Sequence, residues 1–304
     1  MKTHDCKPTL SDRQVIEFCR EGYLRLEGVV APEVTDRILE ECREHPERQD
    51  SSALLEEDWF VEGLLLNPQA AGAVRSLLGA GFGLSPFVAN HIGKCPDASP
   101  LGWHVDGGNM HTFALNYLQA FCLVQETTVQ MGPTEILPGS HFLLGQSGLV
   151  ARYGAIRGAK MCTGPAGTVY ITCYPIWHRR HKATATDGVR HLFKYNYFRN
   201  TAPVRDWIVE SDFDPARHTD DFNHLRAGGT LMRRNFLDSY DTARMYMWLC
   251  GHEDEFRYIG GNAWPAPRND WPDHFDNYAV PPSLRSNGKA PAYRPEAPPM
   301  LSRG

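Results

Sequence analysis

The chain has 304 residues, which is enough for one large domain or two small ones. A hydrophobic content of 42% and a charged content of 22% are typical of a soluble globular protein. The net charge of −5 argues against a general nucleic-acid binder, which would be basic. No apolar run is long enough to span a bilayer, and the first residues lack the hydrophobic core of a signal peptide.

The eight cysteines are spread along the chain without a Cys-x-x-Cys pair. This usage indicates reduced thiols in a cytoplasm and argues against a disulfide scaffold or a zinc site. We therefore expect a cytoplasmic protein whose partner is a small-molecule substrate, with no nucleic acid or membrane involved. A homodimer is left open.

The first elements along the chain are predicted to be helices. Ser11 followed by Gln14 forms a capping box that opens a helix through about Arg20. Pro32 suits the first turn of a second helix, and residues 68–78 predict a third.

From residue 82 onward, short apolar or alternating runs are broken by glycine and proline, which predicts strands. These runs are residues 86–93, 103–106, 118–125, 134–137, 168–174 and 191–199. Their spacing indicates an all-β sandwich or barrel.

The character of the sequence changes after Arg199. Residues 238–250 predict a helix that ends at Gly251. From Trp264 the chain is rich in proline but keeps aromatic residues, which disfavours simple disorder. We expect part of this tail to pack on the domain or on a second copy of the chain and to help close the substrate entrance.

Two histidine-containing segments predict a metal site. His104 and Asp106 are two positions apart, so on a strand their side chains would point to the same face. His178 would come from a distant strand as the third ligand. Two imidazoles and one carboxylate leave the opposite face of a metal open, and this is the ligand set of non-haem Fe(II) oxygenases.

The order of the motifs resembles a known family. The motifs are a helix running into a first strand at 18–30, then Trp103-His104-Val105-Asp106, Pro138-Gly139-Ser140-His141, and Ile176-Trp177-His178-Arg179 followed by Arg190. Over roughly residues 9–200 the chain is similar to the phytanoyl-CoA dioxygenase family of Fe(II)/2-oxoglutarate-dependent oxygenases. The resemblance implies a double-stranded β-helix, or jelly roll, flanked by helices. Helices and a first strand would occupy residues 1–80, the oxygenase core 81–200, and a helical, proline-rich extension of the same domain 201–304.

The resemblance also implies a cofactor set. The three predicted ligands would be catalytic and hold Fe(II), with 2-oxoglutarate and O2 as co-substrates. Arg190 would bind the far carboxylate of 2-oxoglutarate, because a guanidinium is permanently charged and bidentate. Gln119, on an inner strand, and Asn90, on the strand before His104, are expected as further 2-oxoglutarate contacts.

One spacing departs from the family pattern. The gap from His178 to Arg190 is 190 − 178 = 12 residues, one more than the family usually has. An insertion of one residue explains the difference, and His181 stays as an alternative third ligand. His141 is expected to have a structural role rather than to bind the metal.

The implied reaction converts 2-oxoglutarate to succinate and CO2 and hydroxylates, or otherwise oxidises, a small metabolite of a biosynthetic pathway. The carboxylate of Asp106 favours hydroxylation over halogenation, because related halogenases carry a small residue there. Residues 107–111 are expected to border the substrate. The cluster of Arg152, Arg157 and Lys160 fits a solvated face better than an anion site.

Two other functions stay open on the sequence. The first alternative is a non-catalytic jelly roll that binds a ligand or a partner, although it would have no need of the complete residue set. A metal-dependent hydrolase or isomerase on the same fold is a more distant one. Release of succinate from 2-oxoglutarate would distinguish the oxygenase from both.

Overall fold

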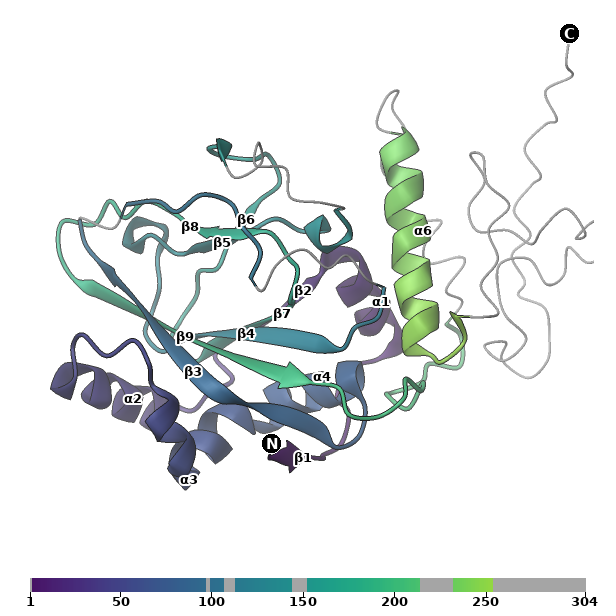
Figure 1. The fold of residues 1–304 in the computed structure, drawn as a ribbon, viewed down its shortest axis with the longest axis horizontal. Coiled ribbons are helices and arrows are strands. Elements are labelled where there is room, and N and C mark those ends of the chain that lie inside the picture. The colour runs from purple at the N-terminus through teal and green to yellow at the C-terminus, as the bar shows by residue number, and fades with distance from the viewer. Residues whose placement is uncertain (1, 97–98, 107–112, 144–151, 214–231, 254–304) are drawn as a thin grey trace, which may run out of the picture.

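The computed structural model describes residues 2–96, 99–106, 113–143, 152–213 and 232–253, and of residues 232–240 only the backbone. Two β-sheets face each other, and helices cover the outer side of the larger sheet (Figure 1). Every strand pair within the two sheets is antiparallel. The predicted jelly roll, mainly β and flanked by helices, is therefore confirmed.

The larger sheet has six strands and the smaller sheet has three. In spatial order, the larger sheet consists of β1 (Thr3–His4), β3 (Phe82–Lys94), β9 (Val189–Phe198), β4 (Tyr117–Leu123), β7 (Thr168–Cys173) and β2 (Tyr23–Leu26). The smaller sheet consists of β6 (Lys160–Met161), β5 (Thr134–Ile136) and β8 (His178–Arg180).

Most of the helices lie where the sequence predicts them. They are α1 (Asp12–Glu21), α2 (Pro32–Glu44), α3 (Asp58–Phe60), α4 (Pro68–Leu78) and α6 (Met232–Leu249), with short 3-10 helices at Ser52–Glu56, Val129–Met131 and Ser140–Phe142 and a π-helical turn at Val61–Leu65. The capping box at the start of α1 is present. No described helix combines the length and the apolarity that a membrane crossing requires.

Strand β9 shows how the larger sheet separates two cores. Phe193, Tyr195 and Tyr197 lie in the main core, which includes apolar residues of α1 and α4. Leu192 points to the smaller sheet and packs in a second cluster that includes Ile136 of β5. Because strand side chains alternate with period two, residues 190 and 194 share the inner face of β9 with Leu192.

The strand predictions need two corrections. Residues 103–106 form no strand, because only His104 is paired, in an isolated antiparallel bridge with His178, and Asp106 lies in a turn. Strand β3 begins at Phe82 rather than at residue 86, and its pairing with β9 shifts in register around Pro86, which has no N–H to donate. The sequence does not predict the short strand β8, because its residues show no strand periodicity.

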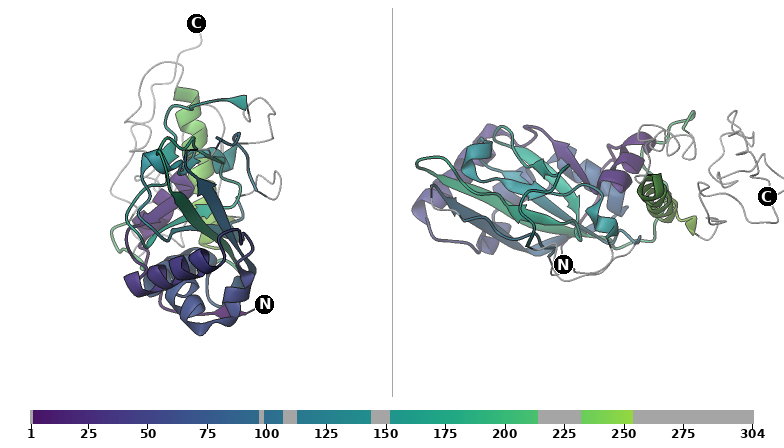
Figure 2. Two further views of the ribbon diagram at one scale, coloured as in Figure 1. Left: turned by 90° about the vertical axis from the view of Figure 1, so that its left-hand side faces the viewer. Right: turned by 90° about the horizontal axis from the view of Figure 1, so that it is seen from above.

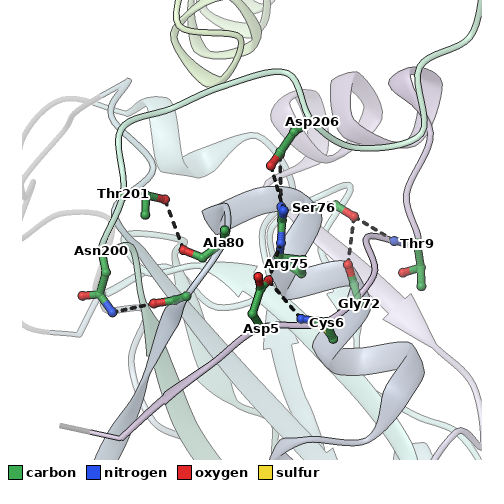
Figure 3. Close-up of polar contacts among 11 residues, drawn as sticks. Asp5, Cys6, Thr9, Gly72, Arg75, Ser76, Ala80, Asn200, Thr201 and Asp206 are labelled. Carbon is green, nitrogen blue, oxygen red and sulfur yellow. Dashed lines mark hydrogen bonds and ion pairs between the residues drawn. The ribbon is translucent and has the colours of Figure 1, made fainter.

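Helix α4 holds two distant segments of the chain (Figure 3). The guanidinium of Arg75 donates to Asp5 at 2.7 Å and to both carboxylate oxygens of Asp206 at 3.0 and 2.7 Å. The N-terminal segment and the segment after β9 are therefore fixed to the same helix face. Asn200 and Thr201 add bonds to the carbonyl oxygens at the C-terminal side of α4.

The C-terminal helix packs against α1 at one end of the sheets, as the views in Figures 1 and 2 agree. The fully buried carboxylate of Asp12 accepts two bonds from Arg205 at 2.8 and 2.7 Å and one each from Trp207 and Tyr246 at 2.7 and 2.8 Å. Helix α6 begins six residues earlier than predicted, at 232 rather than 238. The proline-rich tail from Trp264 lies outside the described residues.

Candidate active site

A cavity of about 390 Å³ lies between the two sheets. The inner face of β3 and β9 forms one wall, and residues of β8 and of the segment bridged to it contribute to the other. The charged and imidazole side chains along both walls include those of His91, His104, His178, Arg180, Arg190 and Lys194. A concave site of this size with a few converging polar groups suits a small molecule.

The backbone brings His104 and His178 together. Each residue donates its N–H to the carbonyl oxygen of the other, at 3.0 and 2.9 Å. Residues directly opposite in such an antiparallel pair point to the same side. The two imidazole rings consequently lie with their centroids 4.4 Å apart.

Backbone carbonyl groups also fix the tautomer of both rings. Nδ1 of His104 lies 2.8 Å from the carbonyl oxygen of Gly102, and Nδ1 of His178 lies 3.0 Å from that of Ile176. A carbonyl oxygen can only accept, so each Nδ1 donates its proton. In the neutral form of such a ring the lone pair lies on Nε2, and this form of imidazole binds a metal.

Asp106 completes the cluster. Its Oδ2 atom lies 3.4 Å from Nε2 of His178 and accepts a bond from Nε2 of Gln119 at 2.8 Å. The ammonium group of Lys194 donates to the same oxygen. One ligand atom from each of His104, Asp106 and His178 lies within 4.8 Å of the others, so the structure brings the three predicted ligands together.

The charge state of the cluster suits a cation. Burial alone raises the pKa of Asp106, but the hydrogen bond and charge of His178, together with Lys194, lower it more, so this pKa lies below its usual range. Burial, followed by the neighbouring His178, lowers the pKa of His104. Near neutral pH the site therefore offers an ionised carboxylate and, at His104, a neutral imidazole, and metals bind these forms.

Arg190 reaches the same cavity from β9. It is only 2% exposed, and its Nε and Nη1 atoms have no hydrogen-bond partner among the described residues. Burial, followed by the charge of Arg180, lowers the pKa of Arg190 to about 10, which still leaves the guanidinium charged at neutral pH. A buried cation with unpaired N–H groups beside a cavity is a site for an anion.

The fold is that of solved 2-oxoglutarate-dependent iron enzymes. The epimerase SnoN from nogalamycin biosynthesis is 19% identical, with a TM-score of 0.51 over 62% of this chain and 83% of that one. HygX from Streptomyces hygroscopicus, solved with nickel and 2-oxoglutarate, is 17% identical, with a TM-score of 0.52 over 66% and 90% of the two chains. EctD from S. alaskensis, solved with iron, is 18% identical, with a TM-score of 0.50 over 65% and 81%.

No protein-family model and no curated protein matches the sequence. At these identities the solved structures support the fold alone. Membership of the phytanoyl-CoA dioxygenase family stays a prediction.

Gln119 lies on the inner face of β4, as expected, but its amide nitrogen is engaged by Asp106. In the structure, the Gln119 side chain therefore holds the Asp106 carboxylate. Its predicted contact with 2-oxoglutarate stays a prediction.

Asn90 is not brought to the cluster. It borders the cavity, but it pairs with Phe193 of β9, whose side chain faces the helices. The Asn90 amide nitrogen donates to the Arg48 carbonyl oxygen at 3.2 Å and lies 3.1 Å from Nδ1 of His191. This side chain therefore points away from Arg190, because side chains alternate along a strand and Asn90 is at a position that faces the helices.

The two other histidines of interest have structural positions. His181 lies 3.5 Å from a carboxylate oxygen of the buried Glu135 and is not part of the cluster, so His178 is the third member. Nε2 of His141 lies 2.8 Å from the Cys19 carbonyl oxygen, which agrees with the structural role predicted for it.

A buried ion pair lies directly behind the histidines. The guanidinium of Arg179 donates to Glu135 at 2.6 Å and lies 4.9 Å from the ring centroid of Trp103. Trp103 and Arg179 are the immediate neighbours of the two histidines in the bridge. Their contact therefore fixes, from the opposite side, the two backbone segments that carry the imidazoles.

The remaining sequence predictions fall outside the cavity. Arg152, Arg157 and Lys160 are exposed and are not among the residues that line it, as expected for a solvated face. Residues 107–111 lie outside the described residues. Lys194 and His91 line the cavity without having been predicted, although the parity of Lys194 with Arg190 on one strand was a usable signal.

Proposed function

We propose that this protein is an Fe(II)/2-oxoglutarate-dependent dioxygenase that hydroxylates, or otherwise oxidises, a small metabolite. The observation that carries the proposal is that His104 and His178 of the metal cluster line the same cavity as Arg190, a buried arginine with two guanidinium nitrogens that have no partner among the described residues. A metal site alone would suit many functions. A metal site with a buried anion site in the same cavity suits an acid that chelates the metal with one end and places a carboxylate in the anion site with the other.

The residues present fit Fe(II). Two imidazole nitrogens and one carboxylate oxygen make the three-ligand set of non-haem iron oxygenases, which leaves positions for other ligands. His104 and His178 would bind through Nε2, since the Nδ1 proton of each is held by a backbone carbonyl. When bound, the iron with O2 and 2-oxoglutarate supplies the oxidising chemistry, and 2-oxoglutarate leaves as succinate and CO2.

The chain's own part in this reaction is positioning. Arg190 would hold the far carboxylate of 2-oxoglutarate through its free N–H groups, and the fork of a guanidinium fits a carboxylate better than the point charge of a lysine. Gln119 would keep the Asp106 carboxylate oriented. The apolar Phe121 and Leu192 on the inner face limit water around the bound acid.

The substrate is proposed to be a small metabolite with an apolar part. Phe87 and Leu101 line the cavity and remain 49% and 48% exposed, so they offer apolar surface to an incoming molecule. A role in a biosynthetic pathway is supported by the comparison with SnoN, which its description places in nogalamycin biosynthesis. Because SnoN is described as an epimerase, an outcome other than hydroxylation of the substrate is part of the proposal.

Succinate production tests the proposal. The purified protein with Fe(II), ascorbate and 2-oxoglutarate is incubated with a metabolite library, and succinate is measured by mass spectrometry. We expect slow formation by the wild type, acceleration by the substrate and none by His104→Ala, which lacks one of the proposed metal ligands. Binding of the metal without binding of 2-oxoglutarate would instead support the non-catalytic jelly roll.

A further inference from the structure

Lys194 makes an ion pair with the carboxylate proposed to hold the metal. Its ammonium group donates to Oδ2 of Asp106, and the two side chains are only 14% and 23% exposed. Lys194 pairs with Ala89 on β3 and with Phe121 on β4, so it projects from the middle of the sheet into the cavity. This contact is therefore built into the sheet register rather than made by an exposed, freely rotating lysine.

The other charges around the cavity have different partners. Arg179 is paired with the buried Glu135, and Arg180 donates to the Ser99 carbonyl oxygen. Asp50, the acid among the described residues that line the cavity, accepts from Ser52. Asp106 is thus the carboxylate within reach of Lys194.

A divalent metal and the Lys194 ammonium would compete for the same carboxylate. Without a metal, the ammonium compensates the charge of a largely buried Asp106. With a metal, a cation of charge +2 would lie a few ångströms from a fixed cation of charge +1. Their repulsion weakens metal binding, and it acts in a partly buried site where salt screens little.

The same positive charge favours anions in the cavity. Lys194 and Arg190 lie on the same face of β9, four residues apart, which is roughly 13 Å at about 3.3 Å per residue. A dicarboxylate that reaches from Arg190 toward the metal would therefore have a cation at both ends. Once a metal takes over Asp106, the Lys194 ammonium is free to attract that acid.

We propose that Lys194 is an internal counter-cation that couples the two binding steps of the site. It holds Asp106 in the metal-free protein, opposes the metal, and favours the dicarboxylate after the metal has bound. The inference rests on the proposed function, because it assigns Asp106 to the metal and 2-oxoglutarate to the cavity. It predicts opposite changes in the two affinities when the charge is removed, whereas simple loss of a structural ion pair would weaken both.

The experiment compares Lys194→Met and Lys194→Gln with the wild type. Mn(II), which resists oxidation, is titrated into the metal-free proteins by calorimetry, and 2-oxoglutarate is then titrated into the Mn(II)-loaded proteins. We expect the Kd for Mn(II) to fall about tenfold and the Kd for 2-oxoglutarate to rise about tenfold in both variants, because both lack the charge. Lys194→Gln keeps a hydrogen-bond donor, so it separates the effect of charge from that of positioning.

Two further variants serve as controls. Lys194→Arg keeps the charge and should stay within about threefold of the wild type in both titrations. Lys94→Met removes a lysine of the same sheet that is paired with Glu47 at 2.9 Å on the exposed surface, and it should change neither affinity, because exposed pairs contribute little.

The outcomes separate the inference from the proposed function. Weaker or unchanged Mn(II) binding by both uncharged variants, with normal 2-oxoglutarate binding by the wild type, overturns the role of Lys194 and leaves the proposed function standing. A wild type that binds Mn(II) but no 2-oxoglutarate ends the proposed function, while tighter Mn(II) binding by Lys194→Met would still support the competition for Asp106.

Discussion

Replacing Arg190 by methionine is expected to stabilise the protein while it removes 2-oxoglutarate binding. Arg190 is almost fully buried, and two of its guanidinium nitrogens have no partner among the described residues. A buried polar group without a partner costs about 1–3 kcal/mol, and this cost disappears when an apolar side chain of similar length takes its place. The free energy of unfolding without 2-oxoglutarate should therefore rise by about 1–3 kcal/mol.

The loss of binding follows from the same contact. Removing one partner of a buried, charged hydrogen-bonded pair costs roughly 2–5 kcal/mol. At about 1.4 kcal/mol per tenfold change in affinity, the Kd of the Mn(II)-loaded protein for 2-oxoglutarate should rise by a factor between about thirty and a few thousand. Calorimetry measures this Kd, and urea denaturation of the metal-free protein measures stability.

Arg179→Met is the matched control. Arg179 is also buried, at 7% exposed against 2% for Arg190, but its guanidinium is bonded to Glu135 at 2.6 Å. The side chains of Arg179 and Glu135 are 8% and 6% exposed. The substitution leaves the buried Glu135 carboxylate without its arginine, with His181 at 3.5 Å as the remaining contact, so it should lower the free energy of unfolding by about 3–5 kcal/mol. The same chemical change at two arginines should thus move stability in opposite directions. If Arg190→Met destabilises the protein and leaves the Kd unchanged, Arg190 is a structural residue and the anion site is elsewhere.

Four further changes test other parts of the structure. His104→Ala should remove bound iron and activity together, measured by metal analysis, whereas His181→Ala should retain both, because His181 is outside the cluster. Asp12→Asn should lower the free energy of unfolding at pH 7 by about 3–5 kcal/mol, because Arg205, whose side chain is 15% exposed, would lose its anion. Burial raises the pKa of Asp12, but its bonds to Arg205, Glu210, Trp207 and Tyr246 lower it more. The stability that the ionised Asp12 contributes is therefore fully present above the ordinary carboxyl pKa of about 3.9. It is lost as the pH falls from there through the lowered pKa of the folded protein. Urea denaturation should therefore show a larger difference between this variant and the wild type at pH 7 than at about pH 3. Deletion of residues after Gly260 should impair substrate-dependent succinate formation but spare binding of Mn(II) and 2-oxoglutarate.

The fold could be predicted mainly from local rules. The capping box at Ser11 and the proline at position 68 predict the starts of α1 and α4, because these signals act within one helical turn. The alternating runs predict the long strands of the larger sheet. Strand β8 could not be predicted, because three residues are too few to show a period and the strand exists through its pairing with β5.

The metal cluster was predicted for a reason that the structure only partly supports. The spacing of His104 and Asp106 suggested a strand, yet Asp106 lies in a turn and is held there by Gln119 and Lys194. Its direction therefore depends on side-chain contacts from β4 and β9, which a local pattern does not contain. The family resemblance points to the same three residues that the structure brings together, while the geometric argument for the pair of His104 and Asp106 was incomplete.

Strand alternation explains why the side chain of Arg190 points into the cavity and that of Asn90 points to the helix side. Arg190 and Lys194 are separated by an even number of residues, so the placement of one on the inner face of β9 also places the other there. Asn90 cannot be assigned in this way, because its face depends on which residue of β9 lies opposite, and the register shift around Pro86 makes that pairing hard to count from the sequence. Once the register is known, Asn90 falls opposite Phe193 and on the helix side. To propose that a side chain in a jelly roll touches a ligand, one therefore needs the register of its strand as well as its chemistry. The register shows that Lys194 projects into the cavity and that the side chain of Asn90 points to the helix side.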